Sequence, residues 1–286
     1  MQFEWWELRI ILVGVLIAIS CSLLSVYIVL RRMAMISEGV SHAGFGGMGI
    51  ALLLGLFLPA MASDGIEQAV TGVFCLVTAL GIGYITKNRH VSHDSAIGIF
   101  LVAAMALGMI FIAFYRALGG NSPKTNLESL LFGQFAAVND LDLIMAGAGV
   151  LVISTLVGLF YNEMLYTTLD EDMARVNGVK VKWINALLLI LISLVIVVGV
   201  RMVGFLMITA MTIIPGATAS MLSRRFGGVM LLSLAIGVLT SVGGLFLIVK
   251  SPWNLSPGPV LVLLMFTVFI VVWIIRHNAR PKLGND

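Results

Sequence analysis

The sequence predicts an all-α integral membrane protein, a polytopic bundle of eight or nine transmembrane helices. Sixty per cent of its 286 residues are hydrophobic, only 11% are charged, and the mean hydropathy is +1.08. Soluble domains carry about 25% charged residues. The apolar runs are long and uniform, unlike the alternating segments of about ten residues in membrane barrels. Lipid requires every backbone polar group to be paired internally, so these runs are expected to be helices.

Nine apolar runs have the length of about 20 residues that spans a bilayer, and together they form one domain, residues 1–286. The first run follows an acidic, aromatic start that includes Trp5 and Trp6, which favours a retained span over a cleaved signal peptide. Only Arg201 and Met202 separate two later runs, so a count of eight spans is the alternative. The runs lie near residues 10–30, 39–58, 66–86, 95–115, 141–160, 183–200, 203–222, 228–249 and 259–275.

Basic residues between the runs predict the orientation, because loops rich in Lys and Arg stay in the cytoplasm. With nine spans, twelve basic residues fall on one face and five on the other, which predicts an outer N-terminus and a cytoplasmic C-terminus. The net charge of +3 is therefore a feature of orientation and no sign of nucleic-acid binding. The twelve are Arg31, Arg32, Lys87, Arg89, Arg175, Lys180, Lys182, Arg224, Arg225, Arg276, Arg280 and Lys282, and the five are Arg9, Arg116, Lys124, Arg201 and Lys250.

Glu38 and His42 are the first candidates for a functional site. They lie four residues apart at the start of the second apolar run, so a helix places both side chains on one face. Ionisable groups in membrane segments are costly and usually functional, and a carboxylate beside an imidazole suits a divalent transition metal. The alternative is a Glu–His pair that only ties helices together.

Weaker candidates lie elsewhere in the chain. His90, His93 and Asp94 form a second cluster that could receive a departing ion, although His90 also fits a solvated loop and Asp94 a helix cap. Pro215 removes one backbone hydrogen bond late in the seventh run and is a candidate hinge. Residues 120–140 predict an amphipathic helix at the outer interface.

Residues 168–178 predict a short, well-capped cytoplasmic helix after the fifth run. Thr168 and Glu171 match a capping box, and acidic residues fill the first turn. Glu171 and Arg175 are spaced for an ion pair, and Gly178 stands where a left-handed C-terminal cap is expected. Such a helix suits docking of a soluble partner, and an ordinary loop helix is the equal alternative.

Several enzyme classes are excluded by missing motifs. The chain contains no His-Glu-x-x-His, no Gly-x-Ser-x-Gly and no Gly-x-x-x-x-Gly-Lys-Ser/Thr, so zinc-protease, hydrolase and ATPase chemistry of these types are absent. An intramembrane hydrolase would have only Ser41 beside His42, and adjacent helical residues point apart. Cys21 and Cys75 lie within apolar runs and are expected to act as small hydrophobes.

These motifs, taken in order along nearly the whole chain, resemble the membrane permeases of the metal-uptake ABC transporters for manganese, zinc and iron. The second run is similar to the family's second-helix signature, in which an acidic residue precedes Ser/Ala-His. The matching segments are Arg31–Ala34 with Ser41–Ala43, Asp94 with Ala96–Ile99, Leu131–Gly133, Asp170–Gly178, and Val203–Ala210 running to Pro215 and Ala217.

The resemblance implies a non-enzymatic transport subunit in the bacterial inner membrane that works as a homodimer. It implies no permanently bound cofactor, with Mn²⁺, Zn²⁺ or Fe²⁺ as cargo. The implied partners are a second copy, a separate ABC ATPase and an extracytoplasmic metal-binding protein, and no nucleic acid. Glu38 and His42 are then the metal ligands and Gly204 and Pro215 packing or hinge positions, and the ATPase-coupling helix contains Asp170, Glu171, Ala174, Arg175 and Gly178.

One departure from the family concerns the carboxylate. The family more often has Asp where this chain has Glu38, and it usually lacks the glycine-rich continuation after His42. The extra methylene moves the carboxylate outward, so metal preference is not carried over with the resemblance. A stand-alone secondary transporter or channel, which needs no ATPase, remains the alternative function.

Overall fold

The computed structural model describes residues 5–58, 62–86, 92–122, 131–133, 138–250 and 257–278. Within these residues the regular structure is helical, and nine helices are long and apolar enough to cross a membrane. This confirms the predicted fold class. The helices are α1 (Trp5–Leu30), α2 (Ala34–Phe57), α3 (Asp64–Thr86), α4 (His93–Ala117), α6 (Asp140–Leu159), α7 (Tyr161–Leu169), α8 (Glu171–Val176), α9 (Val181–Val203), α10 (Phe205–Leu222), α11 (Phe226–Lys250) and α12 (Pro257–Asn278).

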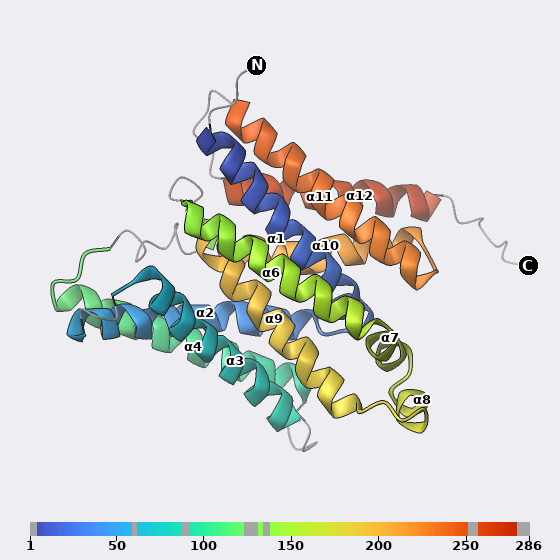
Figure 1. The fold of residues 1–286 in the computed structure, drawn as a ribbon, viewed down its shortest axis with the longest axis horizontal. Helices are drawn as coiled ribbons and strands as arrows, with labels where there is room; N and C mark the ends of the chain where they lie inside the picture. The colour runs from blue at the N-terminus through green and yellow to red at the C-terminus, as the bar shows by residue number, and fades with distance from the viewer. Residues whose placement is uncertain are drawn as a thin grey trace, which may run out of the picture.

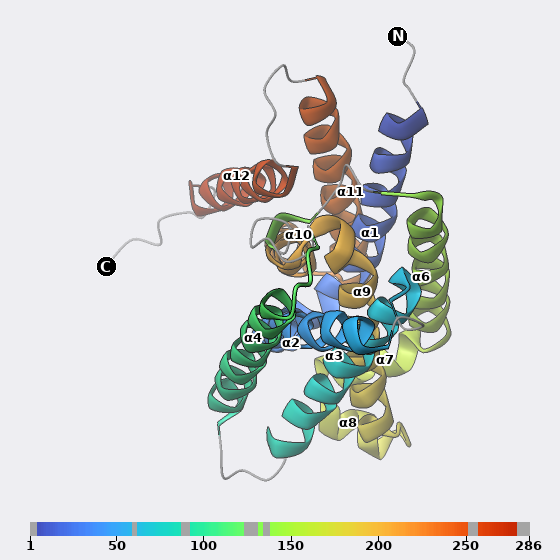
Figure 2. The same ribbon diagram turned by 90° about the vertical axis from the view of Figure 1, so that its left-hand side faces the viewer.

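The spanning helices form two groups that meet along α9 (Figures 1 and 2). In one group, α2 packs extensively against α3 and α4. In the other, α1 packs against α6, α10 and α11, and α12 packs against α10 and α11. Helix α9 contacts members of both groups, and α10 also reaches α2. The second helix is therefore held between its own group and the central pair α9 and α10.

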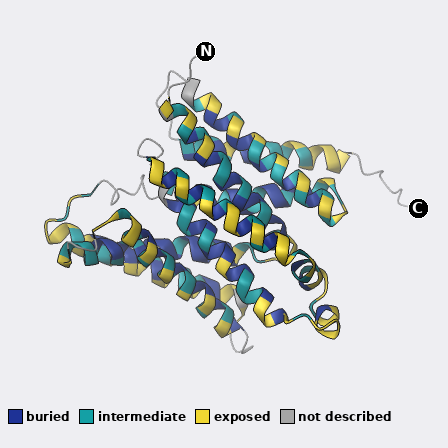
Figure 3. Ribbon diagram, in the orientation of Figure 1, coloured by how far each residue is buried: buried dark blue, intermediate teal, exposed yellow. Residues whose placement is uncertain are grey.

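Burial follows this arrangement. Figure 3 shows buried residues concentrated on the central helices and exposed residues along the outer faces. The large side chains with the least exposure include Tyr27, Phe45, Phe205 and Leu191. Many exposed residues on the outer faces are apolar, such as Val73, as expected where a helix faces lipid. Cys21 and Cys75 are buried free thiols, which confirms their interpretation as small core residues.

Polar contacts at the helix ends join spans that the alternating arrangement places in the same direction. Arg9 pairs with Asp140 at 2.9 Å, so α1 and α6 begin at the same end of the bundle. At the opposite end, Arg276 donates to the carbonyl of Leu222, joining the ends of α12 and α10. The assignment of this second end to the cytoplasm stays a prediction from the basic residues.

A single glycine, Gly204, separates the sixth and seventh spans, which follow each other closely in the sequence. Gly204 separates α9 from α10 with φ +81°, a backbone conformation that glycine adopts without strain. A Cβ there would lie 2.3 Å from the carbonyl oxygen of Leu131 and 2.4 Å from the nitrogen of Gly133. The Leu131–Gly133 motif and the α9–α10 turn are therefore one packed junction, and the two spans are separate helices.

The predicted interfacial helix at 120–140 lies largely outside the described residues, as does His90.

Candidate functional site

Glu38 and His42 lie near the start of α2, on the same face of the helix. The Nε2 atom of His42 is 3.1 Å from Oε1 of Glu38, within hydrogen-bond distance. The side chains are 18% exposed for His42 and 36% exposed for Glu38. The helical spacing thus produces the contact that the sequence predicts, in a region that is neither fully buried nor fully open.

An aromatic stack orients the imidazole. The ring of His42 stacks on Phe45 with centroids 6.0 Å apart, and Phe45 stacks on Phe205 of α10 at 4.3 Å. A side chain at position 44 would collide with Phe205, because a Cβ on Gly44 would lie 2.2 Å from that ring. The glycine therefore lets α10 approach α2 closely enough to complete the stack.

The two ring nitrogens of His42 have different surroundings. Glu38, as a carboxylate, accepts from Nε2 of His42, while Nδ1 of the same ring is buried without a hydrogen-bond partner. Buried polar atoms are usually satisfied. Other buried polar atoms of this chain, such as Tyr27 Oη and Ser41 Oγ, share this property, so the unpartnered nitrogen by itself does not distinguish a ligand site from a structural tie.

The neighbours of α2 define the face on which the pair lies. On one side Ser37 shares a hydrogen bond of 3.0 Å with Thr212 of α10. On the other side a Cβ on Gly46 would lie 3.1 Å from the carbonyl of Ala104, and one on Gly49 would lie 2.8 Å from that of Gly108, both in α4. Gly46 and Gly49 follow His42 by four and seven residues, so helical geometry places Glu38 and His42 on the same face of α2 as this contact with α4, nearer the start of the helix. The glycine cluster after His42 serves close packing of α2 against its neighbours.

Within the described part of one chain, the pair brings together two side chains of the metal-binding kind. Among the residues that the structure describes, no group of three or more His, Cys, Asp or Glu side chains could hold a metal ion. Structural metal sites close their shell with four ligands, and transport sites with fewer and with water. The pair by itself is thus an incomplete site.

The second predicted cluster is only partly visible. The side chain of His93 lies outside the description, and Asp94 is exposed at the start of α4. The proposed capping role of Asp94 is wrong, because Ser92 is the N-cap residue and its hydroxyl accepts from the backbone nitrogen of Ser95 at 3.1 Å. Ser92 precedes the helix by one residue, as the cap position requires.

The short helix after the fifth span exists, with a different N-terminal cap from the predicted one. Asp170 caps α8 by accepting from the backbone nitrogens of Asp172 and Met173 at 2.9 and 3.0 Å. Thr168 belongs instead to the end of α7, where its hydroxyl donates to the carbonyl of Met164. The capping box of Thr168 and Glu171 is therefore wrong, because α7 continues through Leu169 and an acidic residue takes the cap.

The predicted C-terminal cap of α8 is confirmed. Gly178 has φ +81°. Its nitrogen donates to the carbonyl of Arg175, and the nitrogen of Val179 donates to that of Ala174, both at 3.0 Å. This pair of bonds is the Schellman motif. It turns the chain sharply from α8 into α9.

Glu171 makes contacts that the sequence did not indicate. Besides Arg175 at 3.6 Å, its carboxylate accepts from Nη2 of Arg31 at 3.0 Å and from Nδ2 of Asn185 at 3.2 Å. Arg31 was assigned only an orienting role and Asn185 none. The residues are 140 and 14 positions from Glu171, so no local pattern joins them.

Pro215 lies inside the continuous helix α10, and a residue of α1 bonds to the backbone on either side of it. The hydroxyl of Ser25 accepts from the backbone nitrogen of Gly216 at 2.8 Å and donates to the carbonyl of Ile213 at 3.3 Å. A side-chain hydroxyl thus satisfies backbone groups around the proline. The sequence identifies Pro215 as a residue that lacks a backbone donor, but it does not indicate that Ser25 bonds beside it.

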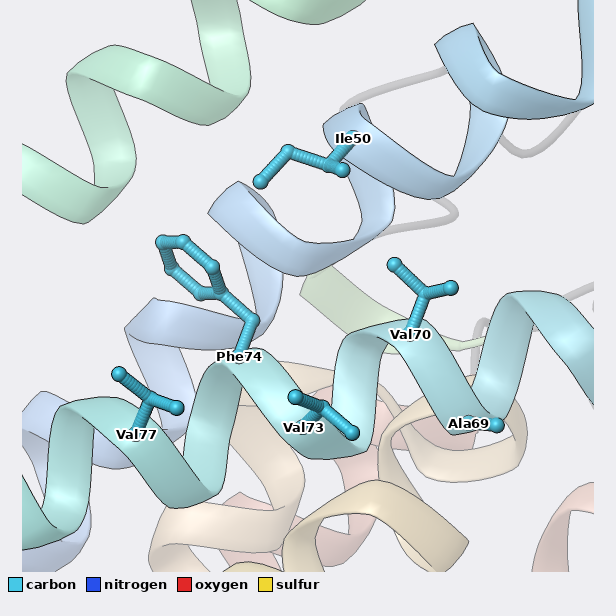
Figure 4. Close-up of a pocket in the computed structure, with 6 residues that line it drawn as sticks. All are labelled: Ile50, Ala69, Val70, Val73, Phe74 and Val77. Atoms are coloured by element: carbon cyan, nitrogen blue, oxygen red, sulfur yellow. The ribbon is translucent and has the colours of Figure 1, made fainter.

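A surface cavity of about 380 Å³ lies on the outer side of α2 and α3 (Figure 4). Its lining offers only apolar side chains and no metal ligand: Ile50, Ala69, Val70, Val73, Phe74 and Val77. It is therefore unrelated in chemistry to the Glu38–His42 pair.

Comparisons with known proteins cover almost the entire chain. The manganese transport system membrane protein MntC of Halalkalibacterium halodurans is 36% identical over 95% of this chain and 86% of its own length. The high-affinity zinc uptake system membrane protein ZnuB of Haemophilus influenzae is 28% identical over 91% of this chain and 94% of its own. PsaBC from Streptococcus pneumoniae, solved in complex with Fab, superposes with a TM-score of 0.80 at 29% identity, covering 94% of this chain and 91% of that one.

The model of the ABC 3 transport family matches residues 6–276. This span includes all nine candidate membrane helices but for a few terminal residues, and the chain belongs to the ABC 3 transport family, as its motifs predicted.

Proposed function

We propose that this protein is the membrane permease of an ATP-driven importer of a divalent transition metal, with Glu38 and His42 as the ligands on the path. The observation that carries the proposal is the partly exposed carboxylate–imidazole contact of 3.1 Å in a span with no other ionisable residue. Relatives named for manganese and zinc transport support the choice of cargo.

A metal ion bound between the two side chains would take the place of the hydrogen bond that they share. The ligands that it requires are an ionised carboxylate and a neutral imidazole. The imidazole is kept in place by its stack on Phe45, which limits the reorganisation that binding requires. A carboxylate oxygen with one imidazole nitrogen suits Mn²⁺, Fe²⁺ and Zn²⁺ alike.

A second copy of the chain completes the site. Two protomers facing each other across a dimer axis would supply two carboxylates and two imidazoles, a full shell for zinc and a partial one for manganese with water. The side chains of the pair keep part of their surface exposed, through which such a partner would reach them. An extracytoplasmic binding protein would deliver the metal at the outer end of this path.

Energy comes from a separate ATPase that docks on α8. The chain has no phosphate-binding motif of its own. The six-residue helix α8 is capped at both ends and exposes Met173 and Val176, a compact surface for a soluble partner.

ATP dependence separates this proposal from the stand-alone transporter or channel. The permease would be co-expressed with an ATPase and a metal-binding protein of the same transporter family from its own genome. Metal uptake would then be measured in vesicles loaded with ATP or with a non-hydrolysable analogue. The proposal predicts uptake of Mn²⁺, Zn²⁺ or Fe²⁺ only with ATP and only with the ATPase present. Equal uptake by the permease alone would favour the stand-alone transporter.

A further inference from the structure

The turn between α1 and α2 contains a buried arginine next to an exposed one. The side chain of Arg31 is only 8% exposed, whereas Arg32 is exposed. Burial lowers the pKa of Arg31, and the neighbouring carboxylate of Glu171 opposes that change. A guanidinium withdrawn from water at the end of a span needs a partner to offset its desolvation. Orientation in the membrane alone would not require burial, since exposed Arg32 serves that purpose equally well.

Three elements meet at the buried guanidinium. Nη2 of Arg31 donates both to Oε1 of Glu171 in α8 and to Oδ1 of Asn185 in α9, and Asn185 donates back to the same Glu171 oxygen at 3.2 Å. The three side chains close a ring of hydrogen bonds. Among the described residues, the hydrogen bonds between α8 and the α1–α2 turn are those of Arg31.

The turn that holds Arg31 is short and tightly bonded. Arg32 has φ +56°, and the nitrogens of Arg32 and Met33 donate to the carbonyls of Val29 and Ile28 at 3.1 and 2.8 Å. This is a Schellman cap with an arginine where glycine is usual. The carbonyl of Met33 then accepts from Ile36 and Ser37 in the first turn of α2. No flexible linker lies between Arg31 and α2.

The metal-site pair follows directly on this turn. Glu38 is five residues beyond Met33, about 7 Å along the helix at 1.5 Å per residue. A displacement of the turn is therefore passed to Glu38 and His42 by helical backbone alone. His42 stacks on Phe45 of the same helix, and Phe45 stacks on Phe205 of α10. A movement of α2 against α10 would therefore change the surroundings of the pair.

We propose that Arg31 is a positioning residue for transport, which passes movement of α8 through Glu171 to the start of α2 and so to Glu38 and His42. The inference rests on the proposed function, since it supposes that an ATPase moves α8. It adds a defined route between the ATPase-facing helix and the ion path. Asn185 anchors the same ring to α9, so the route has a fixed point against which α8 moves.

The test is a double-mutant cycle on the complete complex of permease, ATPase and binding protein in proteoliposomes. The variants are Arg31→Gln, Glu171→Gln and the pair together, with Arg32→Gln as the matched control on the exposed neighbour. Metal imported per ATP hydrolysed is measured together with the amount of ATPase that co-purifies. Wild-type complex that imports no metal with ATP would defeat the proposed function itself, whatever the variants do.

We expect Arg31→Gln to co-purify with the ATPase and hydrolyse ATP while importing at least tenfold less metal per ATP. Arg32→Gln should behave as wild type. Because Arg31 acts through Glu171, the double variant should be no worse than either single one. If Arg31→Gln alone yields little protein, the double variant, in which neither side chain is charged, is compared with wild type instead. The same metal import per ATP is measured. The inference would be overturned if Arg31→Gln imported as much metal per ATP as wild type. It would also be overturned if the losses of the two single variants added up in the double variant.

Arg31→Lys is the conservative variant, because it keeps the positive charge and the hydrogen-bond donors that Arg31→Gln changes. One nitrogen of Arg31 makes both contacts, and the Lys ammonium has three donors with which to keep them. We expect Arg31→Lys to retain the transport ratio within about threefold of wild type, while Arg31→Gln loses it. Equal behaviour of the two variants would contradict the assignment of Arg31. Loss of ATPase co-purification in Arg31→Gln would contradict it as well, because the residue would then support docking.

Discussion

His42 and Ser25 illustrate how single polar side chains are accommodated within apolar spans. His42 is held by ring stacking on one side and by Glu38 on the other, with Nδ1 left without a partner. Ser25 instead satisfies the backbone of another helix around Pro215. The first arrangement leaves bonding capacity for a ligand, and the second uses it to stabilise a break.

Ser25→Ala is expected to destabilise the protein. The change leaves the backbone nitrogen of Gly216 without its 2.8 Å acceptor, and an unsatisfied buried donor costs about 1–3 kcal/mol. The apparent Tm of the detergent-solubilised protein should fall by a few degrees. Thr267→Ala is the control, since its hydroxyl bonds only within α12 and is exposed. Equal Tm values for the two variants would show that the hydroxyl of Ser25 does not stabilise the proline break.

Helix α8 stands out among the elements because it is short and depends on its caps. Six residues are too few for a stable isolated helix, and α8 is held by the Asp170 side chain at one end and the Gly178 turn at the other. Its contacts with Arg31 and Asn185 fix its position relative to α1 and α9. A change in either cap is therefore expected to displace the helix without disturbing the spans.

Gly178→Val is expected to weaken docking of the ATPase. A β-branched residue at φ +81° is strained by about 1–3 kcal/mol, although a Cβ there would meet no neighbour within 4 Å. The readout is co-purification with the ATPase together with metal uptake, both of which should fall. Gly158→Val, also in open space but with helical backbone, is the control. If Gly178→Val leaves docking and uptake unchanged, α8 is an ordinary connecting helix.

At the scale of the whole molecule, the sequence predicted what depends on local pattern. Run lengths located all nine spans, and i,i+4 spacing predicted the contact of Glu38 with His42. It did not predict contacts across the bundle, such as Ser25 with Gly216, because helical periodicity identifies a face and not its partner. The cap of α8 was misplaced for a related reason: Thr168 and Asp170 are both good cap residues, and packing of α7 decided between them.

The proposed homodimer predicts that one defective protomer is enough to stop transport. Two differently tagged copies, one wild-type and one His42→Ala, would be co-expressed, purified through both tags and reconstituted with the ATPase. The mixed dimer lacks one of the four ligands of the shared site. Because both protomers contribute to one ion path, uptake should fall at least tenfold relative to doubly tagged wild type. Half of the wild-type rate would mean that each protomer has its own path.

The central claim is that Glu38 and His42 bind the transported metal, and metal uptake by Glu38→Gln and His42→Ala complexes tests it most directly. Glu163→Gln and His277→Ala, changes of the same kind away from the pair, are the matched controls. Gln keeps the size of Glu38 but lacks the charge that compensates a divalent cation. We predict at least a tenfold loss of uptake in both variants, with normal amounts of protein and normal co-purification of the ATPase. A pair that only ties helices together would show the reverse: unstable variants that still import metal once their folding is rescued at low temperature.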